Sequence, residues 1–218
     1  MIGRVVKSNS HVDYVCQVYG AGEIASPPQP EDYAFGAFVR IGLPPARYGQ
    51  VAAGEGYLVG LVYDTVLVNP EFGHLGPVLR PAEGPCLSLI ADLETFSPDY
   101  LNERAVLVTI VAVGQVTAGG EASQGIPLPA ATLGAPVKKM PADEVRSFHS
   151  SQGGGGLSLA YAPRLLANGE PLMPYLLLRV IGQLAGLFPG QSVPLARVRQ
   201  LAVLRGNLAW KTAVAPLG

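Results

Sequence analysis

The stretch from Gly54 to Pro70, GEGYLVGLVYDTVLVNP, is the most strand-like run in the sequence. It is rich in β-branched, aromatic and aliphatic residues, follows glycines and ends in an Asn-Pro turn signal. A run this continuously apolar predicts a strand that is covered on both faces. Gly60 and Asp64 interrupt it where a tightly curved sheet needs a bend or a bulge. We therefore interpret the run as the central strand of a small β-barrel.

Four further segments show strand patterns: Gly3 to Lys7, Asp13 to Tyr19, Phe35 to Leu43 and Ala105 to Val116. The last is again apolar on both faces, and we expect it to pair with the run at 57–68. Ser8-Asn9-Ser10 predicts a turn between the first two strands. The 27 glycines and 20 prolines are spread along the chain as turn residues, which favours many short strands over long helices.

The pattern changes after the glycine-rich run at 150–156. Helical spacing predicts helices over 157–166, 171–188 and 195–214, and a short helix over 141–148. We predict a β-barrel over 1–120 with an insertion at 71–103, a connector with a short helix and a glycine-rich linker over 121–156, and a helical unit over 157–218. The predicted fold class is mainly β, a small closed β-barrel followed by a short helical domain.

The composition is that of a globular chain with few charges. Of 218 residues only 14% are charged, which indicates a surface that is partly buried against itself or a partner. Residues 171–218 contain five basic residues and no acidic one, while the rest of the chain has ten basic and 16 acidic residues. This asymmetry favours an acidic partner for the C-terminal unit.

The cysteines and the N-terminus bear on the compartment. Cys16 and Cys86 have no metal-ligand spacing and sit among apolar residues, so we interpret them as core residues in a reducing compartment. The opening MIGRVVKSNS lacks the apolar segment of a signal peptide, and the most apolar helical candidate, 172–188, is interrupted by Pro174 and Arg179. We expect a cytoplasmic protein without a membrane span.

The strand segments GRVVKSNSHVDYVCQVY, AFGAFVRIGL, GYLVGLVYDTVLVNP and NERAVLVTIVAVG resemble a HAS-barrel, the small β-barrel of HerA-type DNA translocases and rotary ATP synthases. The resemblance covers about residues 1–116 and rests on strand order and apolar pattern. It implies a barrel that is not catalytic and that helps to form a crown of subunits in a hexameric ATPase. The motor of those ATPases is missing here, because no G-x-x-x-x-G-K-[ST] motif occurs in the chain.

Other chemical motifs are weak or missing. Residues 20–25 match G-x-G-x-x-A, but prolines follow where a dinucleotide site needs a helix, so we interpret them as a turn. No G-x-S-x-G or H-E-x-x-H motif is present. His11, His74 and His149 lack ligand spacing and are predicted in surface loops. The sequence therefore predicts no catalytic residue, no cofactor and no metal.

Two acidic features leave room for an enzyme as a third hypothesis. Asp64, inside an apolar strand, predicts a buried carboxylate that either accepts backbone N–H bonds at a bulge or acts as a catalytic acid. The insertion at 71–103 ends near a charged group that consists of Glu94, Asp99, Glu103 and Arg104. A solvated loop is the simpler interpretation of that group.

The leading hypothesis is a non-enzymatic assembly or adaptor protein, acting as a homo-oligomer or as partner of a HerA-type ATPase. The predicted interface residues are Leu178, Ile181, Leu184, Leu201, Leu204 and Trp210. The alternative is a nucleic-acid-associated protein of DNA processing, whose phosphate contacts would be Arg197, Arg199, Arg205 and Lys211. Salt-dependent DNA binding that disappears when these four become alanine would favour it.

Overall fold

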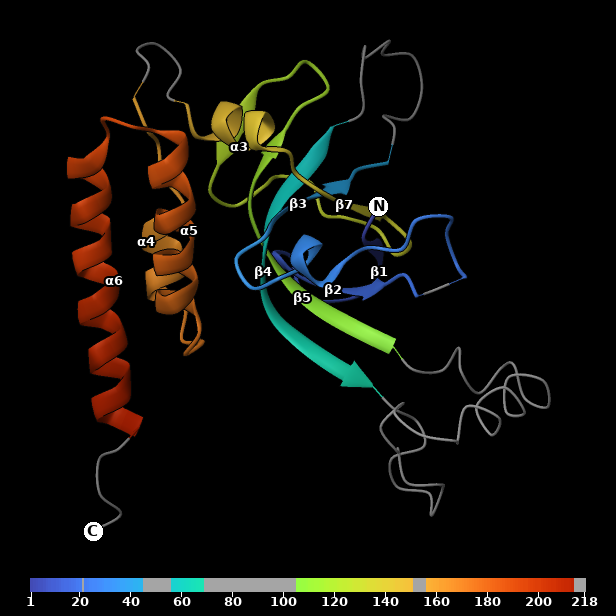
Figure 1. Cartoon of the computed structure of the whole chain (residues 1–218), viewed down its shortest axis with the longest axis horizontal. Helices are drawn as coiled ribbons and strands as arrows, with labels where there is room; N and C mark the ends of the chain where they lie inside the picture. The colour runs from blue at the N-terminus through green and yellow to red at the C-terminus, as the bar shows by residue number, and fades with distance from the viewer. Residues whose placement is uncertain (21, 45–55, 69–104, 151–155, 214–218) are drawn as a thin grey trace, which may run out of the picture.

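The computed structural model describes residues 1–20, 22–44, 56–68, 105–150 and 156–213 (Figure 1). The strands are β1 (Gly3–Ser10), β2 (Asp13–Val18), β3 (Phe38–Gly42), β4 (Tyr57–Val68), β5 (Ala105–Val116), β6 (Ala122–Gln124) and β7 (Pro136–Lys139). The helices are the 3-10 turn η1 (Pro30–Asp32), α3 (Ala142–His149), α4 (Ala162–Ala167), α5 (Met173–Leu187) and α6 (Ser192–Ala213).

The described strands form a closed barrel. Their order is β2-β1-β7-β3-β4-β5, and β2 also pairs with β5, which closes the ring, while β6 adds to the far end of β5. The pairings around the ring are antiparallel. Together with the helices that follow, this confirms the predicted fold class, mainly β with a small closed barrel and a helical C-terminal unit.

Strand β4 is covered on both faces only as far as Tyr63; residues 64–68 are exposed, so the prediction of a covered strand is wrong for its second half. Leu58 and Val62 point into the barrel with no exposed surface, while Val59 and Leu61 point outward into a second core beneath the helices. The pairing of β4 with β5 shifts register between Val59 and Gly60 and again just before Asp64. The bends predicted at these two positions are therefore confirmed as bulges.

Two details of the barrel differ from the sequence prediction. The turn predicted at 8–10 is wrong: β1 continues to Ser10, and the turn lies at residues 11 and 12. The connector contributes β7, which pairs with β1 on one side and β3 on the other. A four-residue strand with the sequence PVKK carries too little pattern to be recognised, because only Val137 points into the core. The insertion at 71–103 lies outside the described residues.

The helical unit packs on the barrel of its own chain. Leu176, Leu177 and Leu184 of α5 are fully buried in one core with Leu61 and Val113 of the barrel wall. Helix α5 lies between the barrel and α6, which forms the outer layer (Figure 1). Helix α6 therefore covers α5 and leaves its opposite face to solvent.

Gly114 of β5 gives a testable consequence of this packing. A Cβ there would overlap the carbonyl oxygen of Ser123 and lie 2.7 Å from Cζ of Phe148. We expect Gly114→Ala to lower the free energy of unfolding by about 1–3 kcal/mol, since backbone and ring must both move. Urea unfolding of this variant beside Gly119→Ala, whose Cβ would meet nothing closer than 3.7 Å, measures the effect. Equal midpoints for both variants would contradict the packing.

Candidate interaction site

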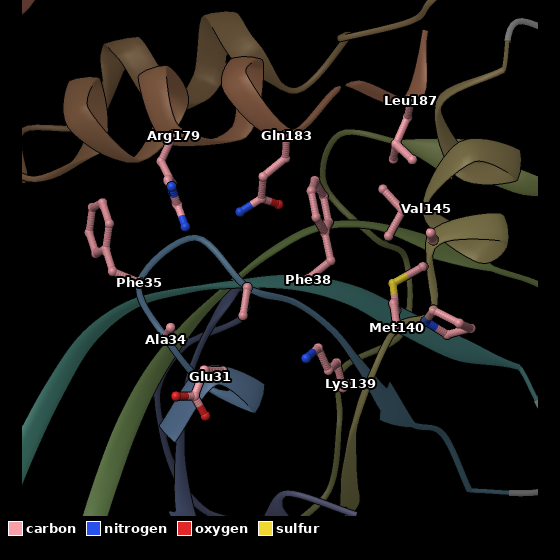
Figure 2. Close-up of a pocket in the computed structure, with 13 residues that line it drawn as sticks. Glu31, Ala34, Phe35, Phe38, Lys139, Met140, Val145, Arg179, Gln183 and Leu187 are labelled. Atoms are coloured by element: carbon pink, nitrogen blue, oxygen red, sulfur yellow. The ribbon is translucent and has the colours of Figure 1, made fainter. Parts of the chain in front are cut away.

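A cavity of about 670 Å³ opens between α5 and the barrel. Its apolar floor consists of Phe35, Phe38, Met140, Val145 and Leu187. These residues come from the loop before β3, from β3, from the link between β7 and α3, from α3 itself and from the end of α5 (Figure 2). Cavities of this volume accommodate drug-sized ligands or a bulky anchor side chain of a protein partner.

Polar side chains stand around this apolar floor. Arg179 and Gln183 reach over it from α5, and Glu31 and Lys139 lie on the barrel side (Figure 2). Lys139 forms an ion pair of 2.9 Å with Asp32, which lowers the pKa of that carboxyl. Arg179 is exposed and makes no ion pair within the described part of the chain. An apolar centre with a mixed polar rim is the composition of a protein interface.

Gly36 sets the distance between α5 and the barrel. Its φ is +83°, a conformation that favours glycine, and a Cβ there would lie 2.5 Å from Cγ of Arg179. The Gln183 side-chain amide donates to the Gly36 carbonyl at 3.1 Å. Arg40 of β3 holds α3, the helix that contributes Val145 to the cavity, through a 2.7 Å ion pair with Glu144. Fixed contacts therefore hold both α5 and α3 against the barrel.

The prediction of a surface position for His149 is wrong, because its side chain is fully buried. Its Nδ1 donates to the Val145 carbonyl at 2.7 Å, and its Nε2 accepts from the Tyr161 hydroxyl at 2.8 Å. Burial lowers its pKa to about 4, so the ring is neutral at pH 7. Both nitrogens are occupied within the core, and the residue joins α3 to the segment before α4. The sequence did contain a sign of this burial: His149 follows Val145 by four residues, a spacing that places both on the same face of a helix.

The predicted interface residues separate into two groups. On α5, Ile181 and Leu184 are buried in the core of this chain and Leu178 packs against that core. Ile181 and Leu184 are therefore covered within their own chain, whereas Leu178 keeps part of its surface exposed. On α6, Leu201 is 56% and Leu204 is 66% exposed. The side chain of Trp210 lies outside what the structure describes.

The three predicted phosphate contacts that the structure describes do not all lie on one face of α6. Arg197 and Arg199 are exposed on α6 but stand two positions apart, about 200° around a helix. Arg205 donates from Nε to the Leu166 carbonyl at 3.2 Å, toward α4. The side chain of Lys211 lies outside the described residues.

The remaining candidates give no chemical site. The prediction of a buried Asp64 is wrong: the carboxylate is exposed and accepts the Thr65 N–H at 2.8 Å beside the bulge. Cys16 lies inside the barrel, where burial raises the pKa of its thiol to about 12. The charged group Glu94, Asp99, Glu103 and Arg104, together with His74 and Cys86, falls outside the described residues.

One surface feature was missed by the sequence analysis, the loop of residues 125–134 between β6 and β7, here named the proline loop. Ile126, Leu128 and Leu133 on it are 66%, 87% and 73% exposed. The segment Ile126-Pro127-Leu128-Pro129 could have indicated this loop, because its prolines prevent the aliphatic residues from joining a regular strand. The sequence pattern predicts only a connector here.

Within the described residues, no group of three potential metal ligands lies close enough to hold an ion. None of the helices in that part of the chain combines the length and apolar content that a membrane span requires. In sequence comparisons, a family model described as a domain of unknown function, DUF8166, matches residues 1–216. No curated protein matches the chain.

Proposed function

The chain belongs to the DUF8166 family, and we propose that it is a non-enzymatic assembly protein that associates with copies of itself through its barrel. One observation carries the proposal: Leu128 stands 87% exposed on the proline loop, while the apolar face of α5 is already covered by the chain's own barrel. Ile126 and Leu133 on the same loop are also exposed, and several exposed aliphatic side chains on one segment support an interaction surface more strongly than a single one does.

The resemblance to HAS-barrels supports the same proposal from a separate direction. In that family the barrel forms contacts between subunits, and the closed barrel of this chain provides a comparable scaffold. An adaptor that binds a HerA-type ATPase through the ATPase's own barrel is the heteromeric version of the proposal. A reducing cytoplasmic location fits both versions, since Cys16 is a buried free thiol.

The nucleic-acid alternative receives less support from the geometry. Proteins that bind phosphate backbones gather their basic residues on one face. Arg197 and Arg199 face different directions on α6, and Arg205 is engaged with the carbonyl of Leu166. The third hypothesis, an enzyme built around Asp64, is weakened because the carboxylate on which it depends is exposed.

Sedimentation velocity of the intact chain over a hundredfold range of concentration tests the proposal. We expect a species whose mass is a defined multiple of 22.7 kDa, the mass of one chain, and which persists at high salt because its contacts are largely apolar. A single 22.7 kDa species at every concentration would contradict self-assembly and would leave only the adaptor version.

A further inference from the structure

We propose that the proline loop of one copy inserts Leu128 into the cavity between α5 and the barrel of the next copy. The inference rests on the proposed self-assembly and adds its geometry. The described part of the chain carries two features that no described residue covers: an exposed aliphatic loop and a cavity with an apolar floor. Insertion of Leu128 into the cavity would remove its aliphatic side chain from water, and Ile126 lies two residues before it in the sequence.

The proline loop is held in place before any partner binds. The Leu128 N–H donates to Oε1 of Gln115 at 2.9 Å, and His11 Nε2 donates to the Pro127 carbonyl at 2.8 Å. The Ala131 N–H donates to the Tyr14 hydroxyl at 3.2 Å. Two prolines further restrict the backbone around Leu128. Docking of such a loop loses little conformational entropy, which is the main cost of binding with a flexible segment.

The cavity fits this occupant. Its floor offers Phe35, Phe38 and Met140 to an aliphatic side chain, and proline-flanked segments commonly dock in grooves lined by aromatic rings. Arg179 at its rim carries a charge without an ion pair in the described residues. Residues 117–134 contain one charged side chain, Glu121, and its negative charge is opposite to that of Arg179.

The two surfaces belong to different parts of the molecule. The proline loop is hydrogen-bonded to His11 in the β1–β2 turn, to Tyr14 of β2 and to Gln115 of β5, and Ala131 packs against the barrel interior. The cavity belongs to the separate core between the barrel and α5. A contact between two different surfaces of identical chains joins the chains head to tail. Such chains form a closed ring when the rotation from one chain to the next divides a full turn evenly.

The exposed face of α6 is the competing surface, and its charge argues against pairing with itself. Leu201 and Leu204 lie on the same face of α6 as Arg197, so a contact between two such faces brings like charges together. Leu204, at 66% exposure, therefore provides a matched control for Leu128.

Light scattering on three variants tests the proposal. Leu128→Asp removes the inserted side chain, and Ala34→Trp fills the cavity from an exposed position on its wall. We expect each to reduce the mass to that of one chain, and we expect Leu204→Asp to retain the full mass. Arg179→Glu serves as a second cavity variant if Ala34→Trp folds poorly, as judged by circular dichroism.

Mixing the two disabled variants separates this arrangement from a general loss of association. A Leu128→Asp chain keeps its cavity, and an Ala34→Trp chain keeps its loop, so an equimolar mixture forms one contact and gives a dimer. A mixture that stays monomeric overturns the proposal, as does a Leu128→Asp variant that retains the mass of the oligomer. A monomeric unmodified chain overturns both this inference and self-assembly, whereas an oligomer unaffected by Leu128→Asp overturns this inference alone.

Discussion

Replacing Leu184 by alanine lowers the free energy of unfolding by about 2–5 kcal/mol, the range for removing a large aliphatic side chain from a packed core. Leu184 has no exposed surface and lies in the core that joins α5 to the barrel. Its loss leaves a cavity between two layers whose backbones are fixed by strand pairing and by the Gln183 contact to Gly36. Urea unfolding followed by circular dichroism measures the change.

Leu204→Ala is the control for this prediction, because that leucine is 66% exposed on α6. We expect its unfolding free energy to stay within about 0.5 kcal/mol of the unmodified chain. The pair also distinguishes two roles for α5. If Leu184→Ala reduced the oligomer mass while the unfolding free energy stayed unchanged, α5 would be an interface between subunits and its packing on the barrel would be contradicted.

Acidification from pH 7 to pH 4 lowers the stability through His149 by about 3 kcal/mol, the linkage energy of a pKa displaced from 6.5 to about 4. The pKa in the folded state is below that in the unfolded state, so the unfolded chain binds more protons between these values. The stabilisation is therefore complete above pH 6.5 and declines as the pH falls toward 4. Desolvation is the physical cause, since the ring is fully buried.

Unfolding midpoints in urea at several pH values between 4 and 7 measure this dependence. We expect His149→Gln to flatten the profile in that interval, because it removes the titrating ring. Tyr161→Phe retains the titrating ring and removes only the hydrogen bond to Nε2, so it lowers stability by about 1–3 kcal/mol and keeps the pH dependence. An unmodified chain with the same midpoint at pH 7 and pH 4.5 would contradict the burial of His149.

Much of the barrel was predictable because its strands carry strong patterns. The run at 57–68 and the segment 105–116 are apolar on both faces, and the structure begins and ends β4 and β5 at these residues. The two bulges followed from Gly60 and Asp64, residues that do not fit a regular strand. Strand β7 was not predictable, since PVKK owes its place to the gap between β1 and β3 rather than to its own sequence.

The surface was much harder to predict than the core. Helical spacing identifies the apolar residues of α5, but it does not show whether the chain's own barrel or another subunit covers them. Ile181 and Leu184 look the same in both cases. The proline loop was hard to predict for another reason: Leu128 lies in a segment without periodicity. Only the hydrogen bond that its N–H donates to Gln115 and the one that Pro127 accepts from His11 show that it is held outside the core.

An engineered disulfide tests head-to-tail assembly most directly. Leu128→Cys and Ala34→Cys place one thiol on the proline loop and one on the cavity wall, in a background in which Cys86 is serine and the native Cys16 is buried. We predict that mild oxidation of the double variant gives a ladder of covalent multimers on a non-reducing gel, while neither single variant gives one. A double variant that remains monomeric after oxidation would contradict the account.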